Sequence, residues 1–186
     1  MALATVLDPA VVWTARLVLA AVFAMAAFAK LRSLDEFVGV VHNYRVLPAF
    51  LVRPVAYGLP PLEAAIALAL LFEPTRSAGA IAAAALLSLF ALAMALNLAR
   101  GRVEIDCGCF AAALRQRISW ALVGRNVTLI ALAALAMPTI TVARVLTWLD
   151  AATIVAASSS AVLLYVAFTQ LRSMALPARL RPGGAS

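Results

Sequence analysis

Five long apolar runs constrain the fold of this chain more than any other feature of its sequence. They cover residues 11–29, 54–72, 78–99, 120–140 and 151–171, and each is close to the roughly 20 residues with which an α-helix crosses a bilayer core. Hydrophobic residues make up 66% of the 186-residue chain and charged residues only 12%, too few to cover the surface of a soluble domain. Because backbone groups in lipid must be satisfied within the segment, such runs are expected to be helical. The sequence therefore predicts an all-α, polytopic membrane helical bundle of about five transmembrane helices, a four-helix core plus one.

The rest of the chain adds little to this single unit. We expect one transmembrane domain over residues 1–176 and a flexible tail over 177–186. Asp8 and the lack of a basic segment before the first run argue against a cleavable signal peptide, so that run should remain as a membrane anchor. The net charge of +7 does not indicate nucleic-acid binding, because Lys and Arg are scattered at the ends of apolar runs. The lipid bilayer is the expected surrounding.

The distribution of Lys and Arg predicts an orientation. Five spans place the long connections 30–53 and 100–119 and the C-terminal tail on one side, and the N-terminus and the short connections on the other. Arg76 and Arg144 are the cations expected on the second side. Eleven are expected on the first: Lys30, Arg32, Arg45, Arg53, Arg100, Arg102, Arg115, Arg117, Arg172, Arg179 and Arg181. The positive-inside rule then puts the first side in the cytoplasm and the N-terminus outside.

The stretch 100–110 carries the chemistry that the apolar runs lack. It reads Arg-Gly-Arg-Val-Glu-Ile-Asp-Cys-Gly-Cys-Phe and contains the only two cysteines, Cys107 and Cys109. Gly108 between them permits a sharp turn, and the neighbouring arginines favour the thiolate form. A redox-active dithiol is the preferred interpretation, since a disulfide across one residue closes a small, easily reduced ring. Palmitoylated or inert thiols and an intermolecular metal site are the alternatives. With His42 as the only histidine, we expect no metal site within the chain.

Two charges of opposite sign lie inside the apolar runs at similar depth. Because charges within a bilayer usually face the bundle interior or a partner, we expect Glu63 and Arg125 to pair, with Asn126 and Asn97 as hydrogen-bonding neighbours. Such a pair either locks the helices together, or tunes the cysteines or moves a proton. Arg16, near the opposite face, is expected to snorkel to the headgroups.

The first long connection lies on the same side as the cysteines. His42 offers either a proton shuttle or a solvated side chain, and Tyr44 is an interfacial type. A re-entrant or amphipathic segment over residues 34–47, acting as a lid over the sulfur atoms, is a further expectation. Four prolines are expected to stiffen or break the helix at the entry to the second span: Pro48, Pro54, Pro60 and Pro61.

Taken in order, these features resemble a known family. The strings FAKLRSLDEF (28–37), NYRVLP (43–48) and LPPLE (59–63) are followed by Asn97, Arg100-Gly101, DCGCF (106–110), Trp120 and Arg125-Asn126. This set is similar to that of the MauE family of methylamine utilisation membrane proteins, related to the DoxX-like redox-associated membrane proteins. The resemblance runs from about residue 16 to 132. The family often has glycine where this chain has Ala111, which affects the turn after Phe110 but not the cysteines.

The resemblance implies a role in the maturation, processing or export of the disulfide-rich β-subunit of methylamine dehydrogenase, in a bacterial inner membrane, beside the thioredoxin-like partner MauD. It makes Cys107 and Cys109 the redox pair of a thiol-disulfide exchange. A quinone acceptor fits by analogy with other membrane bundles that make disulfides, although no residue pattern demands one. The surroundings carried over by motif are Lys30, Tyr44, Glu63, Arg100, Arg125 and Asn126.

Three points stay open at this stage: the side of the membrane that carries the cysteines, and two other functions. Disulfides form outside the cytoplasm, whereas the charge count puts the cysteines inside. Either the pair draws reducing equivalents from the cytosol, which the size of the charge bias favours, or the arginines are functional and the rule misleads. The two other functions are a membrane chaperone or docking subunit without electron transfer, and a small transporter lined by Glu63 and Arg125.

Overall fold

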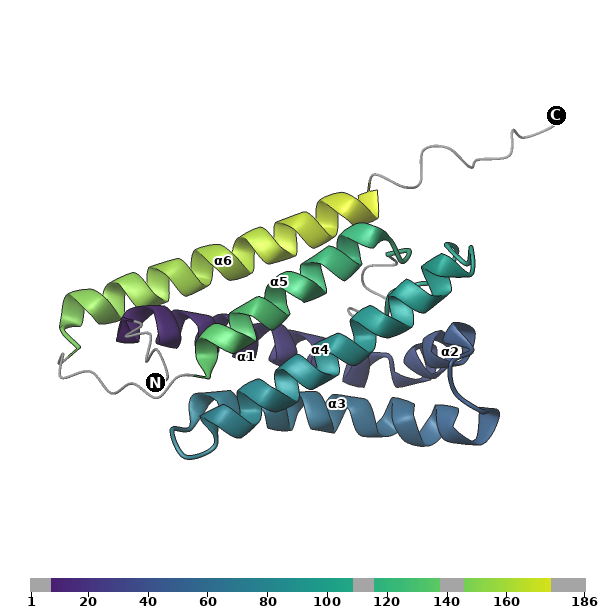
Figure 1. Ribbon diagram of the computed structural model, residues 1–186, viewed down its shortest axis with the longest axis horizontal. Coiled ribbons are helices and arrows are strands. Elements are labelled where there is room, and N and C mark those ends of the chain that lie inside the picture. The colour runs from purple at the N-terminus through teal and green to yellow at the C-terminus, as the bar shows by residue number, and fades with distance from the viewer. Residues whose placement is uncertain (1–7, 109–115, 138–145, 175–186) are drawn as a thin grey trace, which may run out of the picture.

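The computed structural model of the protein describes residues 8–108, 116–137 and 146–174, apart from the side chains of 172–174. These ranges contain six α-helices (Figure 1): α1 Pro9–Arg32, α2 Leu34–Tyr44, α3 Ala49–Leu71, α4 Arg76–Ala99, α5 Trp120–Ala136 and α6 Trp148–Met174. Four of them (α1, α3, α6, and α4 with its preceding turn) are long and apolar enough to cross a membrane, and α5 is a shorter apolar helix. The predicted all-α, multi-pass membrane bundle is confirmed.

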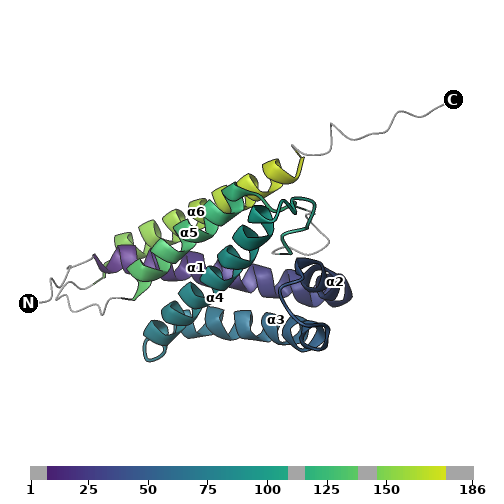
Figure 2. The same ribbon diagram turned by 45° about the vertical axis from the view of Figure 1, so that its right-hand side comes forward.

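Helix α1 is the centre of the bundle, packed against α3, α5 and α6. Helix α4 closes the bundle by packing on α3 and α5, and Figures 1 and 2 show α3 and α6 on opposite edges. Small side chains such as Ala80, Ala83 and Ala133 are fully buried in the core, which lets the backbones approach closely in lipid. In the most apolar 18-residue stretch of α6 only 11% is buried inside the protein, against 50% for that of α1. Helix α6 is therefore the peripheral helix.

The two ends of the bundle differ as the connections predicted. Helix α2, the loop after α4 and the end of α6 gather at one end, whereas the start of α1, the α3–α4 turn and the start of α6 lie at the other (Figures 1 and 2). The end that carries α2 and Cys107 is called the cysteine end below. Residues 138–140 of the predicted fourth span, Cys109 and Phe110, and the predicted tail 177–186 lie outside the described residues.

The prolines of the second span do not break its helix, which was one of the two effects expected of them. Pro48 precedes α3 as its N-cap residue, but Pro54, Pro60 and Pro61 lie inside the helix, which begins at Ala49. Each proline removes one backbone hydrogen bond. Ending the helix within the hydrocarbon would leave more backbone groups unsatisfied than the prolines do, so the helix continues through them.

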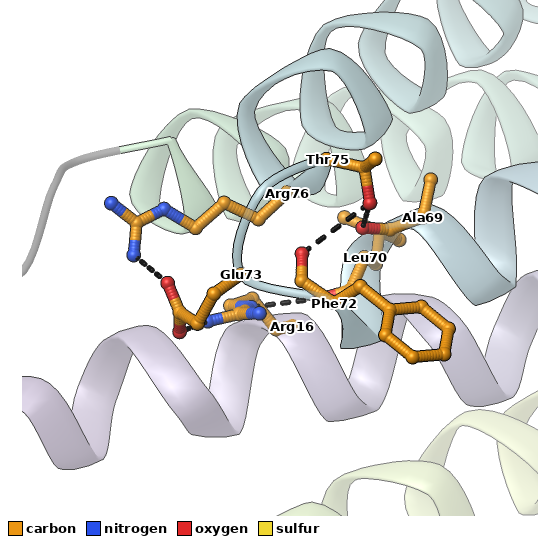
Figure 3. A network of polar contacts seen from close by, with 7 residues as sticks. All are labelled: Arg16, Ala69, Leu70, Phe72, Glu73, Thr75 and Arg76. Carbon is orange, nitrogen blue, oxygen red and sulfur yellow. Dashed lines mark hydrogen bonds and ion pairs between the residues drawn. The ribbon is translucent and has the colours of Figure 1, made fainter.

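Arg16 does not snorkel to the headgroups, contrary to expectation. Its side chain is fully buried: Nε donates to the Leu70 carbonyl at 2.8 Å and Nη1 pairs with Glu73 Oε1 at 2.6 Å. Figure 3 shows this guanidinium reaching from α1 to the α3–α4 turn, where Glu73 also pairs with Arg76. Because an anion and a carbonyl lie within its reach, Arg16 ties α1 to the end of α3 and to the α3–α4 turn from inside the bundle.

Candidate functional site

Backbone hydrogen bonds join the two sides of the loop between α4 and α5. The Cys107 N–H donates to the Gln116 carbonyl at 2.7 Å, and the Ile118 N–H donates to the Ile105 carbonyl at 2.9 Å. Ile105 and Ile118 are buried in a small apolar cluster with Met94 and Leu122. The backbone at Cys107 is therefore fixed to the ends of α4 and α5, while its side chain stays half-buried.

Helix α2 covers the backbone beside Cys107. Gly108 has a φ of +73°, and a Cβ built on it would lie 2.7 Å from Val40 Cγ1 and 3.4 Å from Phe37 Cε2. The Tyr44 hydroxyl donates to the Cys107 carbonyl at 3.3 Å. A left-handed glycine without a side chain is thus what allows the loop to lie this close to α2. Residues 34–44 of the segment expected to act as a lid form α2, which lies against Gly108 and the Cys107 carbonyl, and His42 lies on its exposed face.

Arg102 fastens the C-terminal end of α2 to α4. Its Nη2 donates to the Asn43 carbonyl at 2.9 Å, and its Nη1 donates to Asn97 Oδ1 at 2.9 Å and to the Tyr44 carbonyl at 3.3 Å. The last carbonyls of a helix have no partner within it, and the planar guanidinium binds two of those of α2 at once. The resemblance implied a role for Arg100, whose side chain is exposed. Only the fold distinguishes the two arginines.

Glu63 pairs with Lys30, not with Arg125 as predicted. Lys30 Nζ lies 2.6 Å from Glu63 Oε1 and 2.7 Å from Oε2, and the two residues are 2% and 1% exposed. The reason is the packing order: α3 lies directly on α1, which carries Lys30, whereas α5 packs mainly on α1 and α4. Depth and sign matched for Arg125, but the main packing partners of the helix that carries it are α4 and α1.

Arg125 contacts α6, and Asn126 is buried. The Arg125 guanidinium carbon is 5.3 Å from the centre of the Tyr165 ring on α6, a distance typical of a cation–π contact. Asn126 is 2% exposed, and its Nδ2 has no hydrogen-bond acceptor among the residues that the structure describes. Neither residue lines the cavity described next.

An apolar cavity of about 440 Å³ lies between α2, α3, α4 and the segment 107–108. Most of its walls are formed by apolar side chains such as Phe37, Leu59 and Phe90. Lys30, Tyr44 and Cys107 also line it, and Cys107 Sγ lies 3.8 Å from Met94 Sδ. Of the predicted site residues, the fold therefore brings together Lys30, Glu63, Tyr44 and Cys107, with Glu63 behind Lys30.

The chemistry available here is that of a thiol beside a buried ion pair. Cys109 lies outside the described residues, so the predicted cysteine pair is represented by Cys107 alone. No group of three His, Cys, Asp or Glu side chains that could hold a metal ion occurs in the part of the chain that the structure describes. A sulfur atom open to an apolar cavity at the end of a membrane bundle can exchange with a partner or meet a lipid-soluble molecule.

Known proteins match most of this chain. A family model described as "Methylamine utilisation protein MauE" matches residues 8–139. The methylamine utilization protein MauE of Paracoccus denitrificans is 44% identical over 165 residues, 89% of each chain. That of Paracoccus versutus is 46% identical over 172 residues, 92% of this chain and 91% of the relative. A third, from Methylorubrum extorquens, is 44% identical over 126 residues, 68% of each. No solved structure matches. The range matched by the family model includes every residue that lines the cavity.

Proposed function

Because the chain belongs to the MauE family of methylamine utilisation proteins, we propose that it serves methylamine utilisation as a membrane thiol-disulfide exchange protein. The exchanging groups are Cys107 and Cys109. The partner is a thioredoxin-like protein of the MauD type, and the process is maturation of the disulfide-rich β-subunit of methylamine dehydrogenase.

The setting of Cys107 is the observation that carries this proposal. Its backbone is held by the pairing with Gln116 and by the Tyr44 hydroxyl, while the side chain is half-buried on the wall of a cavity. A cysteine that only packed the core would be buried, since cysteine is among the most buried residue types. A rigid backbone with an accessible sulfur suits in-line attack on a disulfide.

The exchange conserves atoms and electrons. A partner thiolate attacks one sulfur of the Cys107–Cys109 disulfide, a mixed disulfide forms, and the other cysteine leaves as a thiolate. The second partner thiolate then attacks the mixed disulfide and releases the first cysteine. Two electrons have moved from the partner dithiol to the cysteine pair, and the partner's two protons balance the two released thiolates. Run in reverse, the same steps reduce a partner disulfide.

Trapping the mixed disulfide tests the proposal. The variant Cys109→Ser leaves Cys107 without its resolving thiol, so an adduct with the thioredoxin-like partner should accumulate in membranes and disappear on treatment with a reductant. The control Cys107→Ser/Cys109→Ser should give no adduct and no growth on methylamine. Full growth of that double variant would refute the exchange and favour a docking role.

The side of the membrane is open to experiment, because the charge count has lost weight. Among the cations of the cysteine end, Lys30 pairs with Glu63 and Arg117 pairs with Glu104 at 2.6 Å, and Arg102 binds α2. Such side chains have structural reasons for their positions, independent of topology. Labelling Cys107 in intact cells with an impermeant maleimide decides the matter: labelling from outside identifies a disulfide-forming pair, and protection until lysis identifies one that draws on cytosolic reductant.

A further inference from the structure

The cavity at the cysteine end has the dimensions of a ligand site. Its volume of about 440 Å³ lies within the range of roughly 300–1,000 Å³ that is usual for small-molecule pockets. Its walls come from α3 and α4, which are long and apolar enough to cross the membrane, and from α2. A molecule that enters it would come from the bilayer and would be largely apolar.

The charged group that lines this cavity limits the ligand's chemistry. Lys30 is 2% exposed, and its ammonium has three protons, of which the two hydrogen bonds to Glu63 use two. The ion pair is neutral as a unit, so an anionic ligand gains little there. The group that fits is an uncharged oxygen atom that accepts a hydrogen bond from the third N–H of the ammonium.

Two aromatic rings stand beside the same ammonium. Lys30 Nζ lies 5.3 Å from the centre of the Phe37 ring and 5.7 Å from that of Phe90, and both rings line the cavity. Aromatic side chains favour flat, conjugated ligands through offset or edge-to-face packing. Cys107 is on the wall of the same cavity.

We propose that this cavity binds a membrane quinone, with one carbonyl oxygen of its ring accepting a hydrogen bond from Lys30 and its apolar tail lying between α3 and α4. The identification of a redox carrier, as opposed to another flat lipid-soluble ketone, rests on the proposed exchange at Cys107. An apolar body, an accepting carbonyl and a flat ring are united in quinones, which also exchange two electrons.

The electron balance follows directly. The reduced cysteine pair gives up two electrons and two protons as its sulfur–sulfur bond forms, and the quinone takes up both to become the quinol. Electrons then run from the partner dithiol through the cysteine pair to the quinone, so the protein forms disulfides. This is the opposite of the direction that the charge count favoured.

Direct binding of a decyl-tailed ubiquinone to the full-length protein in detergent tests the proposal. We expect saturable binding of one molecule per chain. Ala93→Phe places a ring in the cavity, since Ala93 lines it, and should weaken binding by about tenfold or more. Ala85→Phe is the matched control, because Ala85 lies exposed on the same helix outside the lining. Its affinity should equal that of the parent protein.

A second variant tests the hydrogen bond. Lys30→Met/Glu63→Met replaces the ion pair by apolar side chains of similar length, which usually preserves folding, and should lower quinone affinity by about tenfold through loss of a charged donor. Unchanged binding in both this variant and Ala93→Phe overturns the inference. So does a phospholipid that copurifies in the cavity and resists an excess of quinone.

Cys107→Ser separates the two proposals. Quinone should still bind to it, because the sulfur supplies chemistry more than affinity. Retained quinone binding in Cys107→Ser, together with failure of the mixed-disulfide trap in Cys109→Ser, would reject the exchange and keep the quinone site. Loss of saturable binding from the parent protein, with a successful trap, would reject the quinone site and keep the exchange.

Discussion

Replacing Gly108 by alanine tests how closely residues 107–108, called the cysteine segment below, are held under α2. The added Cβ would lie 2.7 Å from Val40 Cγ1, closer than two such carbon atoms approach, and the backbone has a φ of +73°. Val40 is β-branched and sits on a helix, so it has little rotamer freedom with which to move away. Either α2 or the cysteine segment must shift.

The magnitude separates into two parts. A left-handed conformation costs a non-glycine residue about 1–2 kcal/mol, and an extra methyl group forced into packed surroundings costs about 1–3 kcal/mol. Gly108→Ala should therefore cost about 2–5 kcal/mol. Gly101→Ala isolates the first part, because Gly101 has a φ of +72° and nothing within 4 Å of a built Cβ. That control should cost only about 1–2 kcal/mol.

Thermal unfolding of the purified protein in detergent measures both parts. For a chain of this size about 1 kcal/mol corresponds to a shift of about 2–4 °C in Tm, so Gly101→Ala should lower Tm by about 2–8 °C and Gly108→Ala by clearly more. The rate at which a maleimide alkylates Cys107 should rise in Gly108→Ala and stay unchanged in Gly101→Ala. The first readout reports stability, and the second reports the fit of α2 over the cysteine segment.

The added variant Val40→Ala decides whether the clash is the cause. In Gly108→Ala it should recover about 1–3 kcal/mol, the packing part, and leave the conformational part. Equal losses in Gly101→Ala and Gly108→Ala, with no recovery from Val40→Ala, would refute the close approach of α2 to Gly108.

Two further predictions concern the ion pair and the arginine that fastens α2. Lys30→Met alone leaves the Glu63 carboxylate buried without its cation and should destabilise the protein by about 3–5 kcal/mol, whereas Lys30→Met/Glu63→Met should be nearly neutral; chemical or thermal unfolding of the two variants checks this. Arg102→Lys replaces the planar guanidinium by a compact ammonium, which lacks the fork that reaches Asn97 and the α2 carbonyls at once. It should cost about 1 kcal/mol and speed alkylation of Cys107, while Arg53→Lys at an exposed position should change neither Tm nor the alkylation rate.

The local sequence pattern was sufficient to predict the membrane helices of this protein. Hydrophobic runs of span length determine membrane helices, because lipid leaves backbone groups no partner except their own helix, and five such runs led directly to a bundle with the long connections at one end. The same argument, applied strictly, also accounts for the continuation of α3 through its prolines. A helix end could be placed from Pro48, but not from prolines that lie within hydrocarbon.

Pairing between helices required the tertiary structure. Glu63 and Arg125 have opposite charges at similar depth, yet Glu63 binds Lys30, because charge and depth do not say which helices are neighbours. Arg16 is buried for a related reason: Glu73 and the Leu70 carbonyl are within its reach only when α1 lies against the α3–α4 turn. A sequence determines what a side chain can bind, and only the packing of the bundle determines which partner is near enough.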